Sequence, residues 1–141
     1  MSANQDKHGH YVRNASSDSR RKTFTLAQSF ACAWEGVVYA FTSQRNLKIQ
    51  LCFAIAAVIL GLVFGVSFAE WACIIVCIGV VCGLECVNTA IESVVDLVSP
   101  EWNELAKRAK DCAAGAVYLC SIASVIVACV IYIPHFLSLI G

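Results

Sequence analysis

The chain has 141 residues, of which 59% are hydrophobic and only 14% are charged, and its 10 basic and 10 acidic residues cancel to a formal net charge of zero. This composition is more apolar than that of ordinary soluble domains, so it predicts a membrane protein. Because no basic excess creates a field that would attract a polyanion, the sequence argues against nucleic acid as a partner.

The first part of the chain divides into a polar tail and an amphipathic segment. Residues 1–22 are rich in Ser, Asn, Asp and Arg and have no periodic apolar pattern, which predicts a disordered cytoplasmic tail ahead of a domain spanning residues 23–141. From Phe24 to Phe41, apolar side chains recur at helical spacing. This pattern predicts an interfacial helix whose aromatic rings lie at headgroup depth. A soluble core helix would show the same pattern, but no soluble part of the chain is large enough to cover it.

Three apolar stretches are long enough to cross a bilayer, since about 20 apolar residues span a core of roughly 30 Å. They cover residues 49–68, about 71–98 and 113–134. The second stretch is apolar only to about residue 90, so we expect its cytoplasmic end to project from the membrane. Every Lys and Arg lies before the first stretch or between the second and the third. The positive-inside bias therefore places the N-terminus in the cytoplasm and the C-terminus outside.

Polar residues interrupt the second stretch at intervals of three, four and four, which puts them on one face of a helix. They are Glu85, Asn88, Glu92 and Asp96. A carboxylate within hydrocarbon costs roughly 2.5 to 3.5 kcal/mol on insertion scales, so such residues usually face a bundle interior and mark a functional site. A proton or ion relay and a purely structural ion network are the alternatives that this spacing leaves open.

The segment after the second stretch adds further charged groups to this stripe. Ser99 followed by Pro100 predicts an N-cap and a first-turn proline, and hence a new helix. That helix brings Lys110 and Asp111 to the head of the third stretch. Carboxylates with a nearby Lys suit magnesium and phosphate groups, the combination that phosphoryl transfer needs. The common soluble nucleotide and hydrolase motifs G-x-x-x-x-G-K-[ST], G-x-G-x-x-G and G-x-S-x-G are absent from the sequence.

The nine cysteines do not form a recognisable metal or disulfide pattern. None of them belongs to a C-x-x-C pair, and most lie within the apolar stretches. This placement favours small buried hydrophobic side chains in a reducing compartment over zinc ligands, which need tighter clusters.

The run from Glu85 to Asp111, ECVNTAIESVVDLVSPEWNELAKRAKD, resembles the signature of the small prokaryotic diacylglycerol kinase family, which includes undecaprenol kinases. The likeness continues upstream to Trp34 and the pair Arg45 and Asn46. It implies an all-α membrane protein of the bacterial cell membrane, with three transmembrane helices and an N-terminal amphipathic interfacial helix. It also implies a homotrimer with active sites shared between subunits, Mg²⁺ and ATP as phosphoryl donor, and a membrane lipid alcohol as acceptor.

The resemblance also implies roles for individual residues. Glu85 would be the general base on the lipid hydroxyl, Glu92 a magnesium ligand and nucleotide contact, and Asp96 a supporting residue. Further nucleotide contacts carried over from the family fall on Asn88, Glu101, Trp102, Asn103, Lys110 and Asp111.

One position departs from the family pattern. The family has a Glu as second metal ligand directly before the Arg-Asn pair, whereas this chain has Gln44. An amide oxygen can coordinate magnesium but brings no charge. The stretch VDLVSP at residues 95–100 is more similar to the undecaprenol kinase branch of Gram-positive bacteria than to the proteobacterial diacylglycerol kinases. This resemblance implies a lipid kinase that acts on undecaprenol, with diacylglycerol as second choice. The alternative is a catalytically degenerate member that serves as an assembly subunit or ion pathway.

Overall fold

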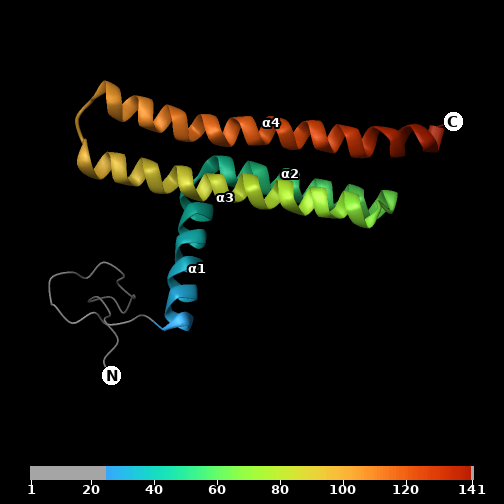
Figure 1. The fold of residues 1–141 in the computed structure, drawn as a ribbon, viewed down its shortest axis with the longest axis horizontal. Helices are drawn as coiled ribbons and strands as arrows, with labels where there is room; N and C mark the ends of the chain where they lie inside the picture. Colours follow the sequence, from blue (N-terminus) through green and yellow to red (C-terminus); the bar gives the residue numbers. More distant parts are fainter. Residues whose placement is uncertain (1–24, 141) are drawn as a thin grey trace. The chain divides into compact units, whose positions relative to one another are not determined.

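The computed structural model describes residues 25–140, and these are helical apart from short connections. In chain order the helices are α1 (Leu26–Ser43), α2 (Arg45–Phe64), α3 (Phe68–Val98) and α4 (Glu104–Ile140) (Figure 1). This confirms the all-α fold class. The predicted tail of residues 1–22 lies outside the described residues.

The chain divides into two compact units between Tyr39 and Ala40. Most of α1 belongs to the first unit. This helix begins with a reciprocal cap, in which the backbone N–H of Thr25 donates to Gln28 Oε1 at 2.9 Å and the backbone N–H of Gln28 donates to Thr25 Oγ1 at 3.3 Å. The cap satisfies two N–H groups that a helix start leaves without partners, and it explains why the helix begins where the apolar period begins.

The second unit contains α2, α3 and α4, all three of which are long and apolar enough to cross a membrane. The helices run alongside one another, with α3 and α4 side by side over most of their length (Figure 1). α3 has 31 residues and α4 has 37, or about 46 and 55 Å at 1.5 Å per residue. Both exceed a bilayer core of roughly 30 Å, so each helix has length to extend beyond it.

A tight turn joins α2 to α3. Gly65 ends α2 with φ at 62°, a left-handed conformation in which a Cβ would be strained. Ser67 then caps α3 in a capping box with Glu70, whose carboxylate accepts from the Ser67 backbone N–H at 2.7 Å. One turn before Gly65, a Cβ added at Gly61 would lie 2.9 Å from the Trp71 ring. A glycine at that position therefore lets the two helices approach closely.

The end of the bundle near this turn holds a small apolar core of Val66, Ile74 and Ile131. Two polar contacts tie α4 to the other helices there. Tyr132 Oη donates to the Ala57 carbonyl at 2.6 Å, and His135 Nε2 lies 3.1 Å from Glu70 Oε1. These contacts fix the register of α4 against α2 and α3, and thereby the position of the polar residues at the other end of α3.

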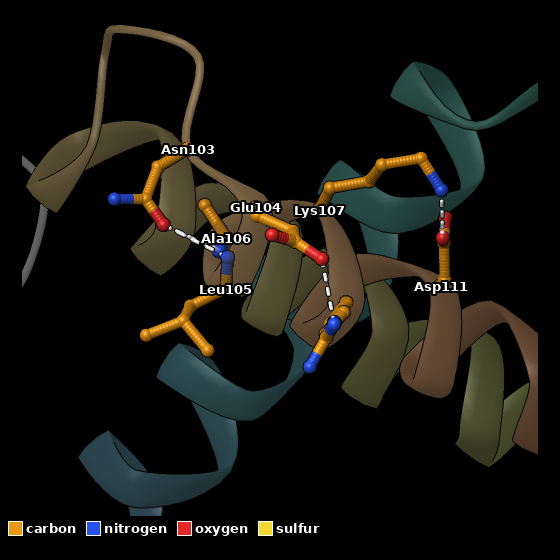
Figure 2. A network of polar contacts seen from close by, with 7 residues as sticks. Asn103, Glu104, Leu105, Ala106, Lys107 and Asp111 are labelled. Carbon is orange, nitrogen blue, oxygen red and sulfur yellow. Dashed lines mark hydrogen bonds and ion pairs between the residues drawn. The ribbon is translucent and has the colours of Figure 1, made fainter.

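The prediction that Ser99 caps the fourth helix was wrong. Ser99 instead ends α3, and α4 begins at Glu104. Asn103 Oδ1 accepts from the backbone N–H groups of Leu105 and Ala106, at 2.8 and 3.3 Å (Figure 2). Because one Asn side chain satisfies two unpaired N–H groups, the helix begins beside Asn103 rather than at the Ser-Pro pair.

Candidate active site on α2, α3 and α4

The polar stripe of α3 lies partly in the interior of the bundle. Glu85 is 2% exposed, Asn88 6% and Thr89 4%, and these are the buried polar side chains of the described residues. Thr89 Oγ1 donates to the Glu85 carbonyl at 2.8 Å within α3, so its hydroxyl is satisfied without using the carboxylate. The Glu85 side chain is therefore left to other partners, as expected of a functional group.

Two glutamine amides, one at the N-cap of α2 and one within α2, donate hydrogen bonds to two carboxylates of α3. Gln50 Nε2 donates to Glu85 Oε1 at 2.8 Å, and Gln44 Nε2 donates to Glu92 Oε2 at 3.0 Å. On α3 itself, Asn88 Nδ2 donates to Glu92 Oε1 at 2.9 Å. Both oxygens of Glu92 thus accept an amide hydrogen bond, and one oxygen of Glu85 does.

Gln50 is a residue of this site that was not predicted from the sequence. The available signal was a polar amide near the start of the apolar stretch 49–68, the same kind of signal that identified the stripe on α3. Gln44 was identified, and the structure places it at the start of α2, where its side chain makes no helix-capping hydrogen bond. Its amide instead extends to Glu92.

The charge balance of this cluster suits a cation. Within residues 25–140, neither Glu85 nor Glu92 forms an ion pair with a basic side chain. In addition, Asn88 Oδ1 and Gln50 Oε1 are buried and have no hydrogen-bond partner in the described part of the chain. Uncompensated carboxylates and unpaired amide oxygens are the oxygen donors that magnesium prefers.

The donor set fits magnesium held jointly with phosphates. No group of three His, Cys, Asp or Glu side chains in the described part of the chain is arranged to hold a metal by itself. Magnesium typically takes only one or two carboxylates and completes its shell with water and substrate phosphates, so Glu92 with an amide oxygen is a sufficient protein contribution. The nitrogen of the Gln44 amide faces Glu92, and Gln44 has to turn this amide over to offer its oxygen to the ion.

Lys110 reaches α3 from the first turns of α4. Its Nζ pairs with Asp96, the last residue of the polar stripe. Asp111 pairs with Lys107 on its own helix, and Arg108 binds Glu104 at 2.6 Å in the same way (Figure 2). The structure therefore brings Lys110 to the stripe, whereas the Asp111 carboxylate is engaged along α4.

The predicted nucleotide contacts between α3 and α4 lie in the connection and are exposed. Trp102 is 82% exposed. The carbonyl of Glu101 accepts a hydrogen bond from Ser99 Oγ at 3.2 Å, and the Asn103 side chain caps α4. Within the described residues, the oxygen of the Asn103 amide is thus used by the fold.

An apolar groove of about 330 Å³ runs between α2, α3 and α4. Gln50, the partner of Glu85, lies in its wall, and so does Tyr132, which binds Ala57. The groove therefore leads from the polar cluster toward the opposite end of the bundle. Its lining is almost wholly apolar and includes Phe53, Ala54, Ile74, Ile78, Val81, Cys82, Val125 and Ala128.

The cysteines take no part in a disulfide or metal cluster of the described residues. All nine are free thiols. Cys77 and Cys82 contribute to the wall of the groove, where a thiol behaves as a small apolar side chain.

Comparison with known proteins identifies the family of this chain. The family model described as prokaryotic diacylglycerol kinase matches residues 31–132. A diacylglycerol kinase of Synechocystis is 45% identical over 115 residues, which are 81% of this chain and 66% of that protein. The undecaprenol kinase of Bacillus subtilis is 37% identical over 119 residues, 84% of this chain and 97% of that protein. A diacylglycerol kinase of Escherichia coli is 30% identical over 104 residues, 74% of this chain and 85% of that protein.

The matched region contains the whole polar cluster, from Gln44 on α2 to Lys110 on α4. The hypothesis of a degenerate assembly subunit or ion pathway receives no support from these relatives, which are named as kinases. With three helices able to cross a membrane and this family match, the chain belongs to the prokaryotic diacylglycerol kinase family and is an ATP-dependent membrane lipid kinase.

Proposed function

We propose that the enzyme transfers the γ-phosphate of ATP to undecaprenol, with Glu85 as the general base. The observation that carries this proposal is the position of Glu85. Its carboxylate is buried, is held by Gln50 at 2.8 Å and has no basic partner among the described residues. Gln50 also lines the apolar groove, so a hydrocarbon tail in the groove would bring a terminal hydroxyl to the carboxylate. A positioned carboxylate can then accept the hydroxyl proton.

The chemistry of the groove lining supports undecaprenol over diacylglycerol as the proposed acceptor. Undecaprenol has one unbroken hydrocarbon tail, whereas diacylglycerol has two chains joined through ester carbonyls that need hydrogen-bond donors. Two of the hydroxyl groups along the groove already donate to backbone carbonyls, Ser124 Oγ to Cys120 and Tyr132 Oη to Ala57. Buried carbonyls without donors are costly. A single apolar tail therefore suits this lining better.

The nucleotide is proposed to bind where the stripe leaves the membrane. Glu92 and Gln44 would hold magnesium, with Asn88 supporting its placement. Lys110 would leave Asp96 to contact the terminal phosphate. When bound, the magnesium ion would neutralise and orient the ATP phosphates. Asp111, Glu101, Trp102 and Asn103 complete the proposed nucleotide contacts.

The proposed assembly and topology follow the family resemblance and the charge distribution. We propose a homotrimer with active sites shared between neighbouring subunits and with α1 lying in the membrane interface. The basic residues of the early part of α4 lie beside the end of α3 that carries Asp96. This end is therefore placed at the cytoplasmic surface, where ATP is available, and the C-terminus is placed outside.

Diacylglycerol is the second candidate acceptor. The specific observation in its favour is the 45% identity to the Synechocystis protein, which is named diacylglycerol kinase. Both lipids carry one hydroxyl at the end of an apolar body, so the same base could serve either of them.

A comparison of the two lipid alcohols tests the proposed substrate. The assay uses purified protein in lipid vesicles with labelled ATP and magnesium. We expect kcat/KM for undecaprenol to be at least about tenfold higher than kcat/KM for diacylglycerol. A tenfold ratio corresponds to a difference of roughly 1.4 kcal/mol in transition-state binding. A reversed ratio would identify diacylglycerol as the substrate. Incorporation of label into neither lipid would contradict the proposed function.

Replacing Gln44 with Glu tests the proposed metal site. In the absence of magnesium, Gln44→Glu removes the amide donor to Glu92 and places two carboxylates side by side, which repel each other. With magnesium, both carboxylates can bind the ion. We therefore expect equal or higher turnover at low magnesium, and a larger rise in melting temperature on adding magnesium than in the unmodified protein. Loss of turnover at every magnesium concentration would show that the Gln44 amide is required as a donor.

A further inference from the structure

Among the described residues, Gln50 both donates a hydrogen bond to the carboxylate of the proposed base and lines the proposed lipid groove. Its Nε2 donates to Glu85 Oε1 at 2.8 Å, and its side chain forms part of the groove wall. Its other polar atom, Oε1, is buried and has no hydrogen-bond partner within the described residues. One end of a single amide thus binds the carboxylate, while an unsatisfied acceptor remains beside the groove.

Both atoms of this amide have a definable use. A donor on Glu85 Oε1 fixes the rotation of the carboxylate and leaves Oε2 for another partner. The bond persists when Glu85 is protonated on Oε2, because Oε1 is then a carbonyl oxygen and still accepts. A buried amide oxygen without a partner is unfavourable unless something supplies a donor. The hydroxyl is the only hydrogen-bond donor that a lipid alcohol such as undecaprenol carries.

We infer that Gln50 is a positioning residue for the lipid alcohol. Its Nε2 orients the Glu85 carboxylate, and its Oε1 accepts a hydrogen bond from the hydroxyl of the incoming lipid before Glu85 takes the proton. This inference rests on the proposed function and deepens it, since it names the group that selects an alcohol at the head of the groove.

The chemical step balances with the groups already named. The O–H bond of the lipid breaks and its proton passes to Glu85 Oε2. The lipid oxygen forms a bond to the γ-phosphorus of ATP while the bond from that phosphorus to the bridging oxygen breaks, and ADP leaves with the electron pair. After release of the lipid phosphate, Glu85 returns its proton to water. Gln50 stays bound to Glu85 Oε1 throughout and exchanges no proton.

The chain provides a matched control at Gln44. Gln44 is the N-cap residue of α2 and Gln50 lies within this helix. Each donates an amide hydrogen bond to a carboxylate of α3, Gln50 to Glu85 and Gln44 to Glu92. Gln50→Met and Gln44→Met each remove one such bond at nearly constant side-chain length. A role limited to helix packing predicts similar effects for both, whereas the inference predicts that they change different kinetic constants.

The experiment measures kcat and both KM values for the full-length protein in vesicles containing undecaprenol. We expect Gln50→Met to lower kcat on the order of 10²-fold, as misplacement of a reacting group does, to raise the KM for undecaprenol and to leave the KM for MgATP unchanged. Gln44→Met is expected to raise the KM for MgATP and to leave the KM for undecaprenol unchanged. Melting temperatures of the variants establish that they are folded.

Several outcomes would overturn the inference. These are a Gln50→Met variant that is folded and has unaltered kcat, or a change in the same kinetic constants for both variants. If Gln50→Met does not fold, Gln50→Asn keeps the amide but withdraws it by one methylene. It is expected to show the same loss of kcat with unchanged KM for MgATP, and full kcat in that variant would also overturn the inference. Absence of lipid phosphorylation by the unmodified protein would instead refute the proposed function.

Discussion

Glu85→Gln is expected to reduce lipid phosphorylation on the order of 10²- to 10⁴-fold, the contribution usual for a positioned general base. The amide that replaces the carboxylate has nearly the same shape, so it can still accept from Gln50 through its oxygen. Its neutral oxygen is far too weak a base to take the hydroxyl proton. Because the buried side chain keeps its size and its hydrogen bond, the variant is expected to remain folded.

Turnover of undecaprenol at saturating MgATP measures this effect, with melting temperature as the folding check. Glu104→Gln is the matched control. Glu104 is an exposed carboxylate at the start of α4 that pairs with Arg108, and such surface pairs contribute about 0–1 kcal/mol. The control should retain full turnover. Equal activity of Glu85→Gln and the unmodified enzyme would exclude Glu85 as the base.

Glu92→Gln is expected to give the second large effect, a loss of kcat/KM for MgATP on the order of 10²-fold. The substitution removes the charge proposed to hold magnesium. It also places an NH₂ group where one oxygen now accepts from Gln44 or Asn88, so one of these amides has to turn over. Both changes act on the nucleotide side of the site, and the KM for the lipid is expected to stay constant.

A magnesium titration separates this variant from Glu85→Gln. High magnesium should restore part of the activity of Glu92→Gln, because mass action compensates for weaker binding, whereas it should not restore Glu85→Gln. Gln44→Glu adds a negative charge at the other proposed magnesium ligand. We therefore expect Gln44→Glu to lower the magnesium concentration needed for activity, whereas Glu92→Gln raises it. Unchanged magnesium dependence in Glu92→Gln would place the metal elsewhere.

The class of protein and the helix face that carries the proposed catalytic residues could both be predicted from the amino-acid sequence. Apolar stretches of spanning length and helical periodicity are local properties, so they predicted α1 to α4 to within several residues at most ends. The spacing of Glu85, Asn88 and Glu92 placed them on one face of α3, because the period of an α-helix is fixed. The resemblance of residues 85–111 to lipid kinases depended on the residue types of this run and their order, and the family match confirmed it.

The hydrogen-bond partners of these residues, in contrast, depend on the packing of the helices and could not be predicted from the sequence. Gln50 and Glu85 are 35 positions apart, and Gln44 and Glu92 are 48 apart. The pairing depends on how α2 packs against α3, which helical periodicity does not specify. The start of α4 depends on which side chain accepts hydrogen bonds from the first N–H groups of the helix. In the structure this side chain is Asn103 and not Ser99. Both cases have the same cause. A local sequence pattern determines which face of a helix is polar. The residues that contact this face, and the residue at which a helix begins, depend on packing and on competition between hydrogen bonds.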